Sequence, residues 1–129
     1  MRTNLRSAIV VTSAAIMGVA CSACQADSTG PNGLGGAWVN AGVWPYYRES
    51  MTLSQAGAHV TGTGTYAMEA GRAGPTTIDG TVSGRTLSLT ITRDYGEVET
   101  FAGRLTDATH LLGFLTIDGH VQSMRYEKQ

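Results

Sequence analysis

The residues that could carry catalysis or bind a metal are few, and their spacing does not bring them together. His59, His110 and His120 lie far apart, without the short H-x-x-x-H or C-x-x-C spacings that present several ligands to one metal ion. Glu97 and Glu99 share one face of an extended chain, as a glycosidase or a calcium site would need, but a solvated strand end is the simpler interpretation. No G-x-S-x-G or phosphate-binding motif is present. We therefore expect no enzyme activity, no cofactor and no bound metal.

A second set of residues could bind a small molecule through shape and polarity. The strand pattern described below gathers these residues at one end of the fold. They are Trp44, Tyr46, Tyr47, Tyr66, Glu99, His120 and Gln122. Binding sites are mostly apolar with a few convergent polar groups, so we predict that Trp44, Tyr46 and Tyr47 form a lid over a ligand. The other four residues are predicted to face inward near this end, where Glu99, His120 and Gln122 would orient the ligand. The alternative is that the aromatic side chains only plug this end and that the polar groups are solvated.

These residues must be positioned by strands, and residues 76–91 show the strand pattern most clearly. A two-residue turn at Ser83-Gly84 would pair Gly80 with Leu87 and Ile78 with Leu89 on one apolar face, leaving the other face polar. Because side chains alternate along a strand, a slip of one residue would turn every apolar group to water. The stretch therefore predicts a half-buried antiparallel hairpin.

The same alternation recurs along the rest of the chain of 129 residues, which suits one domain. Seventeen glycines and only three prolines favour short strands and tight turns. Further turns are expected at residues 56–57, 94–96, 106–108 and 118–119. The pattern predicts an all-β fold, an eight-stranded antiparallel up-and-down meander. Pairing of the last strand with the first would close it into a barrel and remove both edges, whereas a two-sheet sandwich is the rival architecture.

Two details of this pattern concern the faces of the strands. Five glycines fall on the face predicted to be inner, which suggests tight bends or the close approach of a bulky side chain such as Trp38. The last two strands are less regular, because Leu112, Phe114 and Val121 make their other face apolar as well.

The N-terminal segment has the pattern of an export signal and lies outside the fold. Arg2 and Arg6 precede an apolar run at residues 8–20 that is too short to span a bilayer as a helix. Small residues then lead to Cys21 and Cys24, and this junction resembles a bacterial lipoprotein signal, which implies cleavage before a cysteine and a lipid on its thiol. The apolar run stops against Cys21, which favours Cys21 over Cys24; an ordinary secretory signal is the alternative.

The chain then divides into a signal peptide at residues 1–20, a lipidated, flexible tether at 21–33 and a barrel at 34–129. No cysteine follows residue 24, so the barrel must be held by its core without a disulfide. Loss of the signal would leave seven basic and ten acidic residues, which argues against nucleic acid as a partner. We expect attachment to the membrane through the lipid, on the periplasmic side or the outer surface of the bacterial envelope.

Gly36-Ala37-Trp38 opens the first strand and resembles the G-x-W motif of the lipocalin-like, or calycin, barrels. In those families a basic residue on the last strand packs over the tryptophan, and the resemblance assigns that structural role to Arg125. The chain is shorter than a lipocalin and ends without a following helix, so its size is closer to avidin-like barrels or small bacterial protease inhibitors of similar fold. The resemblance implies a carrier of a small hydrophobic or amphipathic ligand, or else an envelope protein that binds a partner through exposed loops.

Overall fold

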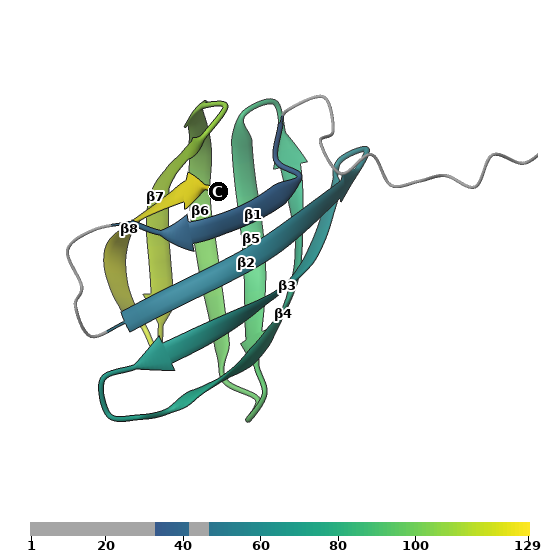
Figure 1. Ribbon diagram of the computed structural model, residues 1–129. Coiled ribbons are helices and arrows are strands. Elements are labelled where there is room, and N and C mark those ends of the chain that lie inside the picture. The colour runs from purple at the N-terminus through teal and green to yellow at the C-terminus, as the bar shows by residue number, and fades with distance from the viewer. Residues whose placement is uncertain (1–32, 42–46) are drawn as a thin grey trace, which may run out of the picture.

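The computed structural model describes residues 33–41 and 47–129, and the described chain forms eight consecutive antiparallel strands. Their bounds are β1 (Gly36–Asn40), β2 (Tyr47–Ala56), β3 (His59–Met68), β4 (Ala73–Ser83), β5 (Thr86–Arg93), β6 (Val98–Asp107), β7 (His110–Ile117) and β8 (His120–Lys128). Each strand pairs with the next one along the chain, as Figure 1 shows. The predicted up-and-down meander is confirmed.

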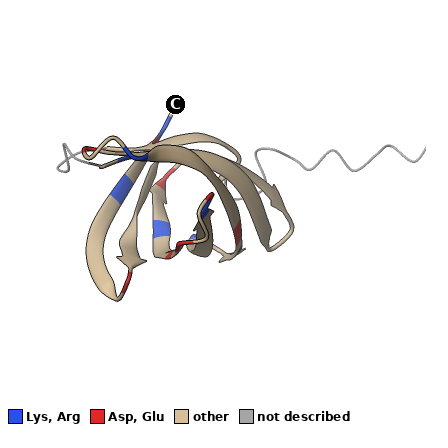
Figure 2. Cartoon of the chain, turned by 90° about the horizontal axis from the view of Figure 1, so that it is seen from below, with Lys and Arg blue, Asp and Glu red and all other residues tan. Residues whose placement is uncertain are grey.

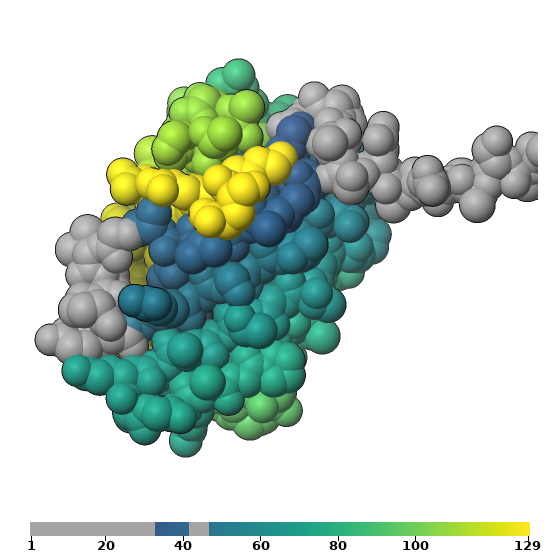
Figure 3. All heavy atoms as spheres, in the orientation of Figure 1, coloured from purple at the N-terminus to yellow at the C-terminus, as the bar shows by residue number. Residues whose placement is uncertain are grey.

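The barrel closes because β1 pairs with β8 as well as with β2. Trp38 lies opposite Met51 on one side and Lys128 on the other, and the backbone N–H of Ala41 donates to the carbonyl of Arg125 at 2.8 Å. In Figure 3 the C-terminal residues, in yellow, pack directly against β1. A closed sheet with this strand order excludes the two-sheet sandwich.

The hairpin between β4 and β5 has the predicted faces but a different register. The two residues of its turn are Gly84 and Arg85, so Gly80 pairs with Leu89 instead of Leu87. Gly84 has a φ of 58°, and a glycine with positive φ at the first turn position matches the type II′ hairpin, whereas the prediction placed it second. The difference moves each partner by two residues, so the inward and outward sets are unchanged.

The remaining hairpins follow the same logic. The β2–β3 turn again has its glycine, Gly57, in the first position, and its register and that of β6–β7 differ from the prediction by two residues. The predicted pairings of β5 with β6 and of β7 with β8 are confirmed. In the β7–β8 turn both Asp118 and Gly119 have positive φ, as a type I′ turn requires.

The interior is packed with the side chains that the alternation assigned to it. Ile78, Leu89 and Phe101 are each at most 4% exposed. The apolar core also contains Leu34, Trp38, Met51, Leu53, Val60, Val82, Leu87, Ile91, Leu105, Leu111, Leu115, Met124 and Tyr126. Burial of each large apolar side chain contributes roughly 1.5–3 kcal/mol, so this core supplies the main stabilising force of the barrel.

Two of the five glycines predicted on the inner face, Gly103 and Gly113, make room for a ring, and it is the ring of Phe101 and not that of Trp38. A Cβ atom on Gly103 would lie 2.6 Å from the Cζ atom of Phe101, and one on Gly113 would lie 2.8 Å from the same atom. Gly103 and Gly113 face each other across β6 and β7. The paired glycines therefore form a hollow in the sheet that the phenyl ring fills.

Trp38 is fully buried at the end of the barrel where residues 33–35 lead into β1. Its indole Nε1–H donates to the carbonyl of Leu34 at 2.8 Å, and the Nζ of Lys128 lies 5.4 Å from the ring centroid. The assignment of Arg125 to this position is wrong, because Arg125 is exposed and forms an ion pair with Glu127 at 3.0 Å. The pairing of β1 with β8 brings Lys128 to the tryptophan instead.

Candidate functional site

Three of the residues predicted to bind a ligand, Tyr47, Tyr66 and Glu99, lie inside the barrel at the end away from Trp38. All three are buried, and the Tyr47 hydroxyl donates to Glu99 Oε2 at 3.2 Å. The Tyr66 hydroxyl donates to Asp94 Oδ1 at 3.0 Å. The inward direction predicted for Tyr66 and Glu99 is confirmed, and Tyr47, predicted to form part of a lid, also points inward. The structure shows all three bonded to the barrel's own side chains.

The centre of this buried polar cluster is Arg93, which sequence reasoning missed. Its Nη2 forms an ion pair with Glu99, and its Nη1 donates to Glu97 Oε1 at 2.9 Å. The guanidinium carbon lies 4.6 Å from the ring centroid of Tyr66 and 5.4 Å from that of Tyr47. Arg93 ends β5 on the inner face in phase with Leu89, and that phase was the signal that could have identified it.

Glu49 is the second charged group that the sequence reading missed, and it is 1% exposed. The Tyr126 hydroxyl donates to its Oε2 at 2.5 Å, while Oε1 has no hydrogen-bond partner among the described residues. Burial, together with the negative charge of Glu99, raises the pKa of Glu49 to about 7. Burial also raises the pKa of Glu99 above its usual range, although the charge of Arg93 opposes that shift.

The cluster therefore holds more carboxylate than guanidinium in a space that water barely reaches. An unpaired buried carboxylate is costly, and protonation removes that cost, which is the physical cause of the raised pKa of Glu49. The neighbouring Tyr47 and Tyr126 hydroxyls have raised pKa values for the same reasons, burial first and the two glutamates second, so they remain hydrogen-bond donors at neutral pH. Most of these groups therefore bond to one another, and Glu49 Oε1 and Arg93 Nε are the atoms of this cluster left without a partner among the described residues.

Two further residues of the predicted set, His120 and Gln122, do not join this cluster. His120 is exposed beside the β7–β8 turn, and Gln122 is partly buried on β8. Trp44 and Tyr46 lie outside the described residues. The structure thus brings three of the predicted residues together and places Gln122 in a different environment.

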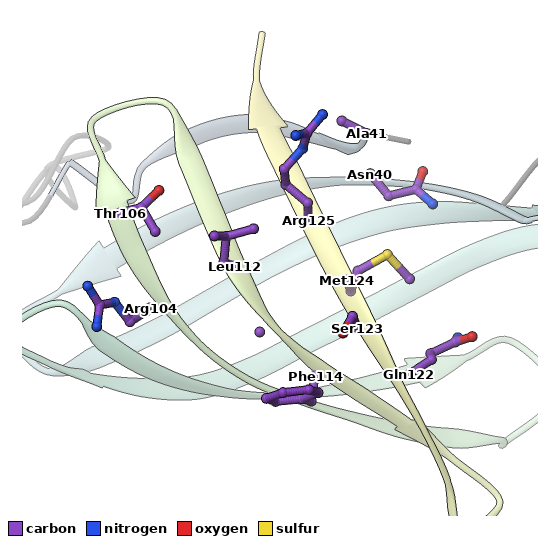
Figure 4. Close-up of a pocket in the computed structure, with 11 residues that line it drawn as sticks. Asn40, Ala41, Arg104, Thr106, Leu112, Phe114, Gln122, Ser123, Met124 and Arg125 are labelled. Carbon is purple, nitrogen blue, oxygen red and sulfur yellow. The ribbon is translucent and has the colours of Figure 1, made fainter. Parts of the chain in front are cut away.

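That environment is a pocket of about 830 Å³ on the wall of the barrel. Figure 4 shows its side chains, which come from β6, β7 and β8 and from the end of β1. The apolar lining is formed mainly by Leu112, Phe114 and Met124. The polar lining is formed by Asn40, Arg104, Thr106, Gln122, Ser123 and Arg125. Gln122 and Met124 lie on the side of β8 that faces Asn40, so the pocket extends around that strand (Figure 4).

The wall beside the pocket exposes large apolar side chains to water. Leu112 is 43% exposed, Phe114 is 57% exposed and Val121 is 65% exposed. Phe114 lies two residues beyond Leu112 on β7, and Val121 pairs with Thr116, two residues further on, so the three form one continuous strip. Contiguous apolar surface of this kind marks binding sites more often than isolated exposed residues do.

Figure 2 shows the charged residues of the described chain distributed over several strands and turns. No group of three or more histidine, cysteine, aspartate or glutamate side chains within the described ranges could hold a metal ion. Nor is any helix there long and apolar enough to span a bilayer.

The wall pocket is the candidate site, because it combines an open volume, an apolar floor and polar groups at its rim. Comparisons with protein-family models, curated protein sequences and solved structures give no match to this chain. Any function must therefore be argued from the geometry of the barrel itself.

Proposed function

We propose that this protein is a non-enzymatic, lipid-anchored β-barrel of the bacterial envelope that binds a small amphipathic molecule in the wall pocket. The observation that carries the proposal is the pocket of about 830 Å³, with Leu112 and Phe114 as its apolar floor on the outer wall and polar side chains around it. This volume falls within the range of sites that hold small ligands, about 300–1,000 Å³. The interior of the barrel is the less favourable location, because its own side chains occupy it.

The anchoring part of the proposal rests on the sequence before the barrel. A positive segment, a short apolar run and small residues before Cys21 and Cys24 resemble a lipoprotein signal. The proposal that the barrel binds a small molecule is supported by the resemblance to lipocalin-like proteins. In those proteins a basic residue of the last strand packs over the tryptophan of the first strand. Lys128 on β8 occupies that position over Trp38.

A fluorescent apolar probe tests the proposed binding site. All eight strands and the buried core lie between residues 34 and 128, so the chain from residue 25 onward carries the complete barrel and lacks both cysteines. We expect Nile red fluorescence to rise with this protein, and Phe114→Ser to weaken probe binding roughly tenfold through lost apolar contact. Val98→Ser is the matched control, because Val98 is 52% exposed on β6 but does not line the pocket. Equal binding by both variants would contradict the proposed site.

A second candidate function is favoured by the exposed strip of Leu112, Phe114 and Val121. An apolar strip on an outer wall is also how a protein-interaction module meets its partner. A photo-crosslinking amino acid at position 114 in the intact host cell distinguishes the two candidates. One discrete protein adduct that is absent with the crosslinker at position 98 supports the interaction module. Adducts to lipid, or the absence of any protein adduct, support the small-molecule site.

A further inference from the structure

Two guanidinium groups flank the apolar floor of the wall pocket in a single row across three strands. Arg104 on β6 lies opposite Leu112 on β7, and Leu112 lies opposite Arg125 on β8. All three side chains point away from the core, and Figure 4 shows them on the same wall. Neighbouring strands are about 4.8 Å apart, so the backbones of the two arginines are separated by about 10 Å. A small group above Leu112 is within reach of both long side chains.

The charge of this pair is available to a ligand, unlike that of the buried Arg93. Arg93 is engaged by Glu97 and Glu99. Arg125 forms an ion pair with the exposed carboxylate of Glu127, at 3.0 Å. An exposed ion pair of this type contributes little to stability, so a ligand can readily replace it. Arg104 is exposed and has neither a hydrogen bond nor an ion pair from its side chain within the described ranges. The row therefore carries two guanidinium groups and a single carboxylate.

The apolar strip continues from this row in one direction. The next row holds Phe114, and the row after it holds Val121 opposite Thr116. At about 3.3 Å per residue, the strip extends roughly 13 Å from the arginine row toward the β7–β8 turn. A molecule with a charged head and an apolar chain would match this order of positive charge followed by hydrophobic surface.

We propose that the ligand of the wall pocket is an anionic amphiphile whose head group binds between Arg104 and Arg125 and whose chain covers Leu112 and Phe114. The inference rests on the proposed function and adds the charge of the ligand. A guanidinium presents paired N–H donors that match the two oxygens of a carboxylate or a phosphate. The shared chemistry is an oxyanion on an aliphatic chain, which a free fatty acid and a lipid phosphate both possess.

Four probes with the same dodecyl chain separate the head group from the chain. Binding of dodecanoate, dodecyl phosphate, dodecanol and dodecyltrimethylammonium to residues 25–129 is measured calorimetrically at pH 8, below their micellar concentrations. We expect one or both anions to bind at least tenfold more tightly than the alcohol and the cation, since a hydrogen bond to a charged group contributes about 1.5–3 kcal/mol. A preference between the two anions identifies the fatty acid or the lipid phosphate as the source of the head group.

Three variants locate the charge. Arg104→Gln and Arg125→Gln should each weaken anion binding about tenfold and leave dodecanol binding unchanged. Arg72→Gln is the control, because Arg72 is exposed in the loop before β4 and lies 5.0 Å from the ring centroid of Tyr95, outside the pocket. The inference is overturned if Arg72→Gln weakens anion binding as much as the other two variants do.

The two proposals can fail separately in this experiment. If dodecanol or dodecyltrimethylammonium binds as tightly as the anions and Phe114→Ser weakens that binding, the head-group inference is wrong and the proposed amphiphile site stands. If none of the four probes binds, the proposed function itself is wrong, and the head-group inference falls with it.

Discussion

Replacement of Glu49 by glutamine should remove most of the pH dependence of the barrel's stability. The carboxyl of Glu49 is buried, has a pKa of about 7 in the folded protein and titrates near pH 4.3 in an unfolded chain. Between these two values the folded state binds a proton that the unfolded state does not. Stability from this group is therefore fully present below about pH 4.3 and is lost as the pH rises through 7.

The magnitude follows from the size of the shift. Each pKa unit corresponds to about 1.4 kcal/mol, so the wild-type barrel should lose on the order of 4 kcal/mol of unfolding free energy between pH 4.3 and 8. Glu99 acts in the same direction, because burial raises its pKa too. The other groups that face Glu49 do not titrate there: Arg93 stays charged and the Tyr47 and Tyr126 hydroxyls stay protonated. The pKa of Asp107 is lowered to about 2, so the effect of Asp107 lies below the range of the assay.

Urea denaturation at pH 5, 6, 7 and 8, followed by tryptophan fluorescence, measures this dependence. Glu49→Gln keeps an acceptor for the Tyr126 hydroxyl but carries no charge, so it should match the wild type within about 1 kcal/mol at pH 5 and exceed its stability at pH 8. Glu69→Gln, an exposed loop substitution, should retain the wild-type slope. A wild-type protein that is as stable at pH 8 as at pH 5, or a Glu49→Gln variant with the full slope, would show that Glu49 does not titrate with a raised pKa in the folded barrel.

Three further predictions concern the contact between β1 and β8, the packing of the core and the lipidated cysteine. Lys128→Gln should lower stability by about 1 kcal/mol in thermal denaturation, because it removes a cation near the indole ring and a hydrogen bond, while Arg125→Gln should change stability by less than about 0.5 kcal/mol. Gly113→Ala should destabilise the barrel by about 1–3 kcal/mol, since its Cβ would overlap the facing strand and the phenyl ring in the core; an unchanged melting temperature would contradict this packing. Cys21→Ser should abolish incorporation of an alkyne-labelled fatty acid in the host and Cys24→Ser should not, and the reverse result would move the lipid to the second cysteine.

The faces of the strands could be predicted from the sequence, but the register could not be predicted throughout. Alternation places Ile78 and Leu89 on the inner face regardless of which residue each pairs with, because a shift of two residues preserves the direction of every side chain. The register depends on where glycine sits in the turn. Asp118-Gly119 signals a type I′ turn directly, whereas a lone glycine such as Gly57 or Gly84 fits either turn position until the backbone is known.

Contacts between distant strands were the least predictable. Lys128 lies over Trp38 in place of the predicted Arg125 because of the register between β1 and β8. These are the first and last strands of the barrel, and no local turn determines how they pair. Glu49 and Arg93 are charged residues that face inward and are buried. From the sequence, each is expected at the solvated end of a strand, and only the closed barrel brings the two together.

The wall pocket did have a signal in the sequence. Leu112, Phe114 and Val121 make the outer face of the last hairpin apolar, which departs from the alternation seen in the other strands. In the structure both strands are regular and these side chains are exposed on the wall. An apolar residue in the outward phase of a well-defined strand is thus better interpreted as a binding surface than as a break in the pattern.

The position of the ligand can be read from the amide chemical shifts of residues 25–129 during separate titrations with dodecanoate and dodecyl phosphate. The largest shifts should fall on β6, β7 and β8, around Arg104, Phe114 and Arg125. Shifts concentrated at the buried polar cluster around Tyr47 and Glu99, or no shifts with either anion, would contradict the proposed site.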